Sequence, residues 1–472
     1  MNTRAAAVER YTAASTNISR SGAGGAVPRT FLVTGGRAPA ALDLARQLSA
    51  QGHIVYAADS LPNPLIRFSN AVQRYYLLPS PRFELKRFTE VLKQIVVECR
   101  IDVILPVCEE VFYIAFVKNK LGACEVFADE LGKLQQLHSK WEFIQLLREL
   151  GLPAPHTRLL RSDADLQKLA SRADGSLMLA TVSSATVGSE TGPNLTNPAS
   201  SEFIPVDRAA SLNTPERTGE NGESGIVSHW VLKPVYSRFG DAVRFYSAGD
   251  PLPEIRPSAE YPWVAQQAIK GDEYCAYAIV HQGKLQAFTA YPALYTAGRG
   301  ANVYFRQEIS PPLLEWTTEF VSRIGFHGQI AFDFIVEQGG KVYPIECNPR
   351  GTSGLHLFGP RDRIDKAIAG NCGDSAIIPR QPKPRMIAAA MLAYGPGSGR
   401  AREQSMLAGT RRWFSSLVAG RDVLLDFADL SPALAQGYVA ADLWRRARAA
   451  GQSLKQFTTQ DIEWNGMVDS NE

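Results

Sequence analysis

The chain has 472 residues, a formal net charge of +3 at pH 7 and 45% hydrophobic residues, so it is long enough for several domains and a large core. A charge balance this close to neutral gives no electrostatic argument for a nucleic-acid or membrane-surface partner. No apolar run approaches the roughly 20 residues of a membrane-spanning helix. The six cysteines are scattered without a C-x-x-C pair, which favours reduced thiols in a cytoplasmic protein over a disulfide frame or a zinc site.

Residues 1–28 are rich in Ala, Ser, Thr and Arg, and Glu9 is their only acidic residue. A transit peptide has this composition, and so does a disordered tail, which is the commoner case. We expect a disordered tail and keep targeting as the alternative.

Strand-like and helix-like segments alternate over residues 29–136, which predicts a parallel sheet flanked by helices. Gly35-Gly36 follows the first strand but lacks the third glycine of G-x-G-x-x-G, so an NAD site is not predicted. Glu109-Glu110 follows the third strand and either faces a ligand or favours the start of a helix. The expected strands are 30–34, 53–58, 102–106 and 124–128, and the expected helices are 39–51 and 83–100.

A helix start signal stands at Ser139, with Glu142 three residues later as in a capping box. We expect the helix to reach Leu150 and to end at Gly151. Lys140 falls in the first turn, where the helix dipole disfavours a cation by a few tenths of a kcal/mol. The position therefore calls for an explanation beyond helix stability.

Residues of about 174–225 are rich in Ser, Thr, Asn, Gly and Glu and contain few aromatics. Such a segment cannot bury enough apolar surface to offset the entropy lost on ordering. We expect a disordered insertion without a chemical role.

The most informative stretch is a hairpin pattern from Gln329 to Arg350, with Gly339-Gly340 as a two-residue turn signal. If Gln338 pairs with Lys341, Asp333 falls directly opposite Glu346. Opposed residues have Cβ atoms roughly 4.5–5.5 Å apart. Two carboxylates at that distance repel by about 3 kcal/mol at an effective dielectric of about 20. A Mg²⁺ bound between them would neutralise the repulsion, so the pair is a candidate metal site.

Alternation along the two strands separates an apolar face from a polar one. Ile330, Phe332 and Phe334 share the apolar face, with Ile345 and Cys347 opposite them. The polar face carries two acids, an amide and a guanidinium: Asp333, Glu346, Asn348 and Arg350. The alternative interpretation is a solvated outer face, and a bulge near Gly339 would shift the register.

The run Glu346-Cys347-Asn348-Pro349-Arg350, followed by Gly351-Thr352-Ser353-Gly354, resembles the metal-binding signature of the ATP-grasp superfamily, and Asp333 stands where that family has its other acidic ligand. The resemblance implies that Asp333, Glu346 and Asn348 hold Mg²⁺, or Mn²⁺, against the phosphates of ATP. It also implies that Arg350 steadies the transferred phosphoryl group.

The same resemblance implies an ATP site. Lys233, within Val231-Leu232-Lys233-Pro234, matches a lysine of the family that contacts ATP, and Lys140 matches another at the start of a comparable helix. The phosphate-covering loop would be residues 236–243, where Gly240 is the single glycine and Ser237 and Arg238 take the place of others. The residues implied for the adenine hinge and the acidic position after it are Gln266, Gln267, Ala268, Ile269 and Glu273.

Arg299 lies in a glycine-rich loop where family members contact a carboxylate substrate, and a surface arginine is the alternative. Residues 396–472 are expected to be partly helical, notably 432–450. This extension either covers the substrate site or makes the contact of a homo-oligomer, and the sequence leaves both open.

The predicted fold is α/β: a disordered tail, a Rossmann-like domain, an ATP-grasp unit of two subdomains and a partly helical C-terminal extension. The predicted boundaries are 1–28, 29–136, 137–265, 266–395 and 396–472.

The function implied by the resemblance is an ATP-dependent carboxylate–amine ligase that works through an acylphosphate and releases ADP and phosphate. Its partners would be a small, amino-acid-like carboxylic acid and an amine. Two alternatives remain: a bicarbonate-activating carboxylase or carbamoyl phosphate synthase-like enzyme, and a non-catalytic ATP-binding protein.

Overall fold

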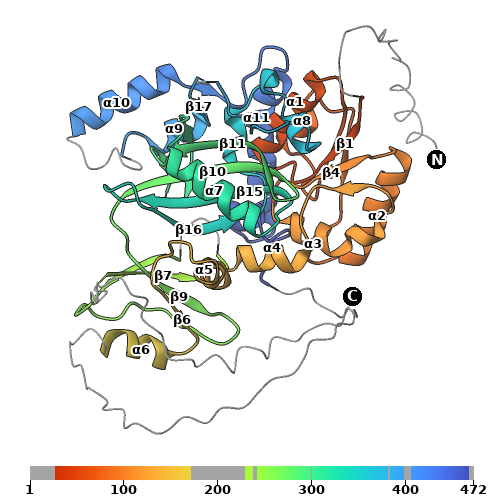
Figure 1. Cartoon of the computed structure of the whole chain (residues 1–472). Helices are drawn as coiled ribbons and strands as arrows, with labels where there is room; N and C mark the ends of the chain where they lie inside the picture. Colours follow the sequence, from red (N-terminus) through yellow and green to blue (C-terminus); the bar gives the residue numbers. More distant parts are fainter. Residues whose placement is uncertain are drawn as a thin grey trace, which may run out of the picture. The chain divides into compact units, whose positions relative to one another are not determined.

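The computed structural model describes residues 27–171, 229–237, 242–298, 300–380, 383–397 and 406–466 (Figure 1). The chain divides into two compact units, residues 155–268 forming one and the rest of the chain the other. Each unit has its own sheets and its own hydrophobic core.

The first unit begins with the predicted parallel sheet, in the strand order β3-β2-β1-β4-β5. The predicted strands are confirmed, and β3, whose residues Arg74–Leu77 are all at least partly exposed, is an additional edge strand. The strands are β1 Thr30–Val33, β2 Ile54–Asp59, β3 Arg74–Leu77, β4 Val103–Leu105 and β5 Glu125–Val126; the helices are α1 Pro39–Ala50, α2 Leu85–Glu98 and α3 Glu110–Val117.

A second sheet in the same unit is antiparallel, in the order β11-β10-β15-β16. One face packs on α7, where Trp316 and Phe320 meet Phe332 and Phe334 with ring centroids between 5.0 and 5.5 Å apart (Figure 1). The strands are β10 Asp272–His281, β11 Lys284–Pro292, β15 Gly328–Val336 and β16 Val342–Asn348, and α7 is Pro311–Arg323.

Two helices connect the sheets of the first unit: α4 Leu131–His138 and α5 Lys140–Glu149. Ser139 caps α5 as predicted, since its Oγ accepts the N–H of Glu142 at 3.3 Å. The reciprocal half of the capping box has no free donor, because the N–H of Ser139 already bonds to Gln135 O at the end of α4. Gly151, at φ +65°, follows the helix end.

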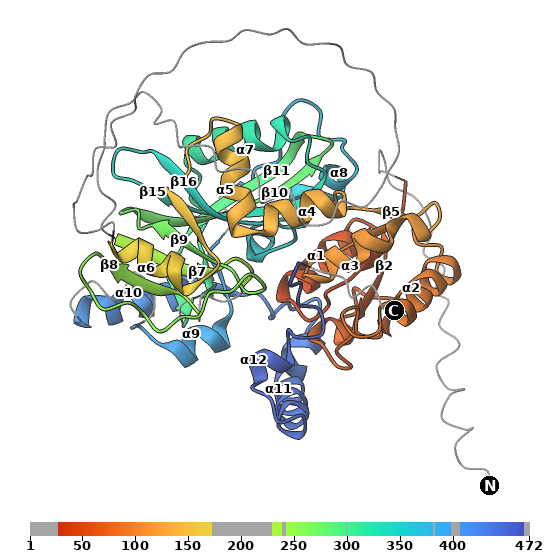
Figure 2. The same ribbon diagram turned by 90° about the horizontal axis from the view of Figure 1, so that it is seen from below.

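The remainder of the first unit consists of short elements and C-terminal helices, with α11 and α12 side by side in Figure 2. The short strands are β12 Thr296–Ala297, β13 Ala301–Asn302, β14 Tyr304–Phe305, β17 Arg385–Met386 and β18 Arg421–Asp422. The helices are α8 Ile364–Ile368, α9 Ala388–Tyr394, α10 Met406–Ala419, α11 Ser431–Ala449 and α12 Leu454–Phe457, and short 3-10 helices are Leu65–Phe68, Lys118–Lys120, Ser353–Leu357 and Pro360–Asp362.

The second unit is an antiparallel sheet in the order β6-β9-β7-β8 with one helix, α6. Its core contains Trp230, Leu232 and Ala265. The elements are β6 Thr157–Leu160, α6 Asp163–Ser171, β7 His229–Pro234, β8 Arg244–Ser247 and β9 Trp263–Gln267. The predicted small subdomain began at residue 137, whereas α5 lies in the first unit, where its Phe143 packs on Phe320 and Phe332.

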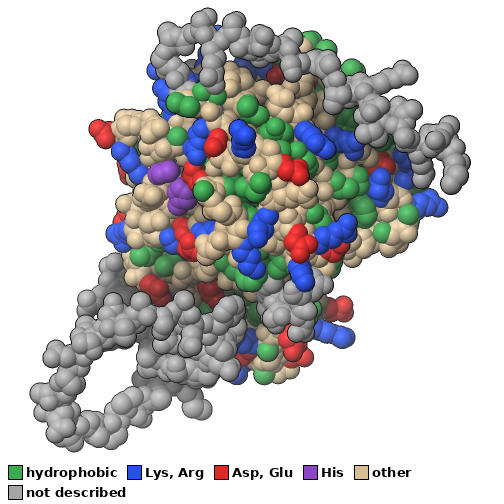
Figure 3. All heavy atoms as spheres, turned by 90° about the vertical axis from the view of Figure 1, so that its right-hand side faces the viewer, with side chains coloured by type: hydrophobic (Ala, Val, Ile, Leu, Met, Phe, Trp, Pro, Cys, Tyr) green, Lys and Arg blue, Asp and Glu red, His purple; other side chains and the backbone are tan. Residues whose placement is uncertain are grey.

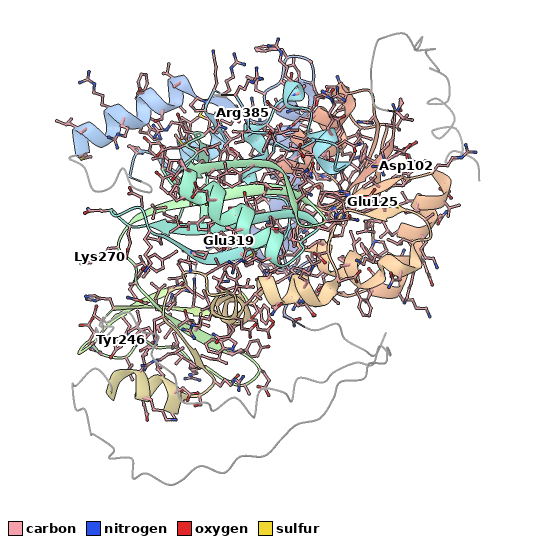
Figure 4. All side chains as sticks on the ribbon, in the orientation of Figure 1. Asp102, Glu125, Tyr246, Lys270, Glu319 and Arg385 are labelled. Carbon is pink, nitrogen blue, oxygen red and sulfur yellow. The ribbon has the colours of Figure 1, made fainter. Side chains whose placement is uncertain are left out.

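Charged side chains lie on the surface and pair with groups at the edges of the parallel sheet. Figure 3 shows basic and acidic side chains interspersed over one face of the molecule. Asp102 and Glu125, labelled in Figure 4, fix the start of the parallel sheet: Asp102 accepts the N–H of Thr30 at 2.7 Å, and Glu125 pairs with Arg29 at 2.8 Å. Among the described residues, no helix combines the length and apolarity needed to cross a bilayer.

Candidate active site

The hairpin of β15 and β16 brings Asp333 directly opposite Glu346, as predicted. The register of the strands near the loop differs from the prediction, however. Val336 pairs with Val342 and Phe334 with Pro344, one position out of the register that a Gly339-Gly340 turn would set. The tip is a longer loop in which Glu337 N bonds to Lys341 O at 3.0 Å and Gly340 has φ +83°.

A bulge at Ile345 restores the register. The ladder steps from the pair Phe334–Pro344 to the pair Asp333–Glu346, which leaves Ile345 as the extra residue. Ile345 was predicted to lie opposite Phe334 in the core, but Pro344 takes that place and is buried, while Ile345 is half-buried. The bulge therefore re-aims the strand so that Glu346 and Asn348 share a face with Asp333.

The two acids belong to a row of side chains that crosses all four strands: Tyr291, Cys275, Asp333 and Glu346. Cys275 Sγ donates to Asp333 Oδ1 at 2.9 Å, and Asn302 Nδ2 donates to Cys275 Sγ at 3.1 Å. Burial first, and the Asp333 carboxylate second, raise the pKa of Cys275 well above its ordinary value. Cys275 therefore stays a thiol and orients Asp333.

Lys140 reaches this row from the first turn of α5. Its side chain is only 3% exposed, and Nζ lies 3.4 Å from Glu346 Oε2. A buried ammonium costs several kcal/mol unless it is paired. The pairing explains why a lysine occupies a helix position that the dipole disfavours.

Arg350 lies beside Asn348 just after β16. Nη2 donates to Asn348 Oδ1 at 3.3 Å and Nη1 donates to Gly351 O at 3.1 Å. Its Nε is buried and has no hydrogen-bond partner in the part of the chain that the structure describes. Buried donors without a partner are rare, so the Nε group is available for a ligand.

Two residues that the sequence did not assign to this cluster also belong to it. His138 is buried immediately before Ser139, and burial lowers its pKa to about 4; the charges of Lys140 and Arg350 also lower this pKa, whereas those of Glu109 and Glu346 raise it. Glu109 is 1% exposed and lies at the end of the parallel sheet, where its Oε2 accepts the N–H of Trp464 at 3.0 Å. In the sequence, the position of Glu109-Glu110 after a predicted parallel strand indicated that these residues could face a ligand. No feature of the sequence indicated that His138 belongs to the site.

The remaining nucleotide-site candidates lie mainly in the second unit. Lys233, 5% exposed, is in β7 opposite Val264 of β9. Gln266 is buried and its Nε2 donates to Thr157 Oγ1 at 3.4 Å, whereas Gln267 Oε1 accepts from His156 N at 3.4 Å. Ala268 N donates to His229 O at 3.0 Å, so this N–H is already used within the sheet.

Ser237 follows β7 and its Oγ donates to Pro234 O at 3.4 Å. Ile269 follows β9 and is assigned to the first unit. Glu273 lies on β10 opposite Ile335, two residues from Cys275 and on the same face of the strand. Arg238, Gly240 and Arg299 lie outside the described residues.

The oxygen atoms of Asp333, Glu346 and Asn348 make a donor set that fits a hard divalent cation. The directly opposed pair Asp333–Glu346 is the feature that argues for one, because it gathers two negative charges that the ammonium of Lys140 offsets only in part. Among the described residues, no group of three or more His, Cys, Asp and Glu side chains is placed to hold a metal ion. A cation here would therefore rest on two carboxylates, an amide and ligand oxygens.

We compared the chain with protein-family models, curated proteins and solved structures. Residues 206–354 match the family model of the ATP-grasp domain. A search of the curated proteins finds no match to the sequence.

Solved structures resemble the fold over most of the chain. The ADP complex of purK, an N5-carboxyaminoimidazole ribonucleotide synthetase, is 12% identical with a TM-score of 0.50, and the alignment covers 76% of this chain and 80% of that one. The ATP complex of carboxyaminoimidazole ribonucleotide synthase from Aspergillus clavatus is 11% identical with a TM-score of 0.50 and covers 76% and 82%. An L-amino acid ligase from Bacillus licheniformis is 14% identical with a TM-score of 0.48 and covers 75% and 78%.

Proposed function

We propose that this chain is an ATP-grasp protein and an ATP-dependent ligase that joins a carboxylate to an amine; the match of residues 206–354 to the ATP-grasp domain supports the proposal. The observation that carries the proposal is the arrangement around Glu346. Its carboxylate opposes Asp333 across the hairpin and lies 3.4 Å from the ammonium of Lys140. Acids, an amide and cations lie at one place, and the described residues around them include no nucleophile activated by a base, which favours phosphoryl transfer over covalent catalysis.

Mg²⁺ fits the oxygen set of Asp333, Glu346 and Asn348, with Mn²⁺ as a substitute. When bound, the cation supplies neutralisation of charge on the phosphate oxygens of ATP. Cys275 holds Asp333 in place through its thiol hydrogen bond.

Arg350 and Lys140 would act on the transferred group. The γ-phosphoryl of ATP passes to an oxygen of the substrate carboxylate, which breaks the bond to ADP and forms an acylphosphate. The nitrogen of the amine then attacks the acyl carbon, phosphate leaves, and the amine loses a proton to solvent. Charge on the phosphoryl oxygens spreads in the transition state, and the unpaired Nε of Arg350 is the donor in this cluster best suited to stabilise it.

The nucleotide would be held by residues whose roles are also proposals. Lys233 would pair with phosphate, and Ser237, Arg238 and Gly240 would cover the phosphates. Glu273 and the segment of Gln266, Gln267, Ala268 and Ile269 would line the nucleoside. Since Ala268 N already bonds to His229 O, an adenine contact there would use the carbonyl group of Ala268.

Arg299 would bind the substrate carboxylate. Replacement by alanine should then raise the Michaelis constant for the acid and leave that for ATP unchanged. An unchanged constant for the acid would remove Arg299 from the site.

The deciding experiment is product analysis. The protein is incubated with Mg·ATP and pooled amino acids, small carboxylic acids and amines, and ADP plus phosphate is scored against AMP plus pyrophosphate. The proposal expects acid-dependent ADP and phosphate, together with a new mass equal to acid plus amine minus one water. AMP and pyrophosphate would overturn the acylphosphate route, and a product that requires bicarbonate would favour carboxylation.

A further inference from the structure

The carboxyl edge of the parallel sheet is the natural place for a ligand in the first unit. Strand order runs from β1 to β2 and β3 on one side and to β4 and β5 on the other, so the chain changes direction between β1 and β4. Ligands of open α/β sheets bind in the crevice at such a point. A small cavity lies there, lined by Thr34, Gly35, Asp59, Ser60, Glu110 and Ile462.

A C-terminal strap, residues 458–464, crosses this crevice. Arg37 Nη1 donates to Thr458 O at 2.8 Å, and Tyr113 OH donates to Glu463 O at 2.8 Å. Ile462 is 3% exposed, and Trp464 is 1% exposed and stacks on Phe112 at 5.3 Å. The strap contains no strand and none of the residues of α12. Its backbone is held by further hydrogen bonds, which include those that Arg82 N and Ser80 Oγ donate to Asp461 O at 3.3 and 2.8 Å.

At the centre of the strap, the carboxylate of Asp461 is bound as a ligand would be. Arg37 Nη1 donates to Oδ1 at 2.6 Å and Nη2 to Oδ2 at 2.7 Å, which is the two-pronged geometry of arginine with a carboxylate. Ser60 Oγ donates to Oδ2 at 2.6 Å. Burial raises the pKa of Asp461, but the hydrogen bond and charge of Arg37 outweigh it and hold that pKa below its ordinary value.

The receptor half of this contact is organised without Asp461. Asp59, whose side chain is 1% exposed, accepts from Arg37 Nε at 3.0 Å and from the backbone N–H of Arg37 at 2.7 Å. Asp59 therefore already neutralises Arg37 and fixes the direction of its guanidinium. The carboxylate of Asp461 therefore binds to a guanidinium that Asp59 has already oriented, which is the arrangement of a preformed carboxylate site.

The crevice also adjoins the candidate active site. Gln329 Nε2, from the hairpin of β15 and β16, donates to Pro106 O at 2.8 Å at the end of β4. Cys108, two residues further on, is close enough to both Arg37 and Arg350 for each guanidinium to influence its pKa, which burial raises. A ligand at Arg37 would thus extend toward Arg350.

We propose that Arg37 and Ser60 form a binding subsite for a carboxylate group of a ligand, and that the protein's own Asp461 fills this subsite until the ligand displaces the strap. The inference goes beyond the proposed function, since Arg37 and Ser60 have no part in it and ligand binding is measurable without ATP turnover. A tethered carboxylate competes at an effective concentration of mM or more, so it weakens a free carboxylate on the order of tenfold or more.

The test is binding of succinate, with acetate and inorganic phosphate as parallel probes, to the full chain by calorimetry. Asp461→Asn keeps the shape and backbone contacts of the strap and removes its charge. We expect it to bind succinate on the order of tenfold more tightly than the wild type. Glu463→Gln is the matched control: it breaks the ion pair of Glu463 with Arg82 (3.0 Å) in the same strap, neither residue lines the cavity, and the variant should bind as the wild type does.

The double variant Arg37→Gln with Asp461→Asn should lose the gained affinity. Hydrogen exchange of residues 458–464 gives a second measurement on the unaltered protein, where saturating succinate should accelerate exchange. Equal succinate affinity of folded Asp461→Asn and wild type, or exchange that succinate leaves unchanged, would overturn the proposal and leave a structural ion pair. Tighter phosphate than succinate binding would overturn the assignment to carboxylates.

Discussion

Lys140 Nζ lies 3.4 Å from Glu346 Oε2, so two residues far apart in the sequence form one charged pair at the candidate active site. The pair gives the two opposed acids different surroundings. Glu346 is matched by a buried ammonium, whereas Asp333 is held by the thiol of Cys275. The two carboxylates should therefore respond differently to removal of their charge.

Asp333→Asn should leave the stability of the metal-free protein unchanged or slightly higher, because it relieves the repulsion between the carboxylates. Glu346→Gln should lower it by about 1 kcal/mol, because the buried ammonium of Lys140 loses the negative charge of Glu346. Both variants should lose Mg²⁺-dependent ADP formation. Urea unfolding in the presence of a chelator, paired with an ADP assay, checks this. Wild-type turnover in either variant would contradict the metal assignment.

Cys275→Ala should raise the Mg²⁺ concentration for half-maximal activity by about 10-fold or more, because residues that orient a metal ligand typically contribute that much. Cys275→Ser retains a hydrogen-bond donor to Asp333 and should stay near the wild type. Titration of ADP formation with Mg²⁺ distinguishes the two variants. If serine is as damaging as alanine, the thiol acts through packing and not through its hydrogen bond.

Arg350→Lys should lower kcat on the order of 10³-fold. A lysine keeps the charge but loses the planar donors that stabilise the transferred phosphoryl group in the transition state. The melting temperature should fall slightly, because the hydrogen bonds of Nη1 to Gly351 O and of Nη2 to Asn348 Oδ1 are lost, and the Michaelis constant for ATP should change little. Steady-state kinetics and a thermal melt test both points. A rise in KM with unchanged kcat would place Arg350 in ground-state binding only.

Gly340→Ala should destabilise the protein by about 1 kcal/mol, because Gly340 has φ +83°, whereas Gly339→Ala should be neutral. Added Cβ atoms meet no other atom at either position, so the comparison isolates backbone conformation. Urea denaturation of both variants supplies the measurement. Equal losses would instead support a two-residue turn in which both glycines need positive φ.

Stability should fall with acidification because of His138, whose pKa is lowered from 6.5 to about 4 in the folded protein. Between these two values the unfolded chain binds a proton that the folded protein does not. Folding therefore loses up to about 3 kcal/mol as pH falls through this window, and nothing from this residue above it. His138→Gln should lose less stability than the wild type between about pH 7 and pH 4.5 in urea titrations. Parallel losses in the two proteins would show that His138 does not titrate in this way.

Much of the fold could be predicted because its signals are local. Alternating strands and helices predicted the parallel sheet, and Ser139 predicted the start of α5. The hairpin around Gln282 and Gly283 has positive φ at both residues, as its two-residue turn requires. These features depend on neighbouring residues and on backbone preferences, so one sequence contains them.

By itself the sequence determined that this stretch forms a hairpin, and it predicted that Asp333 and Glu346 are opposed across it. It did not determine the register of the strands between the loop and this pair. The one-residue slip at the loop and the bulge at Ile345 cancel, so the pairing of Asp333 with Glu346 is the same with or without them. Only the tertiary structure decided that Lys140 meets Glu346, that His138 lies buried beside them and that Asp461 crosses the chain to Arg37. These contacts join distant segments through packing, and packing is set by the whole core rather than by any local pattern.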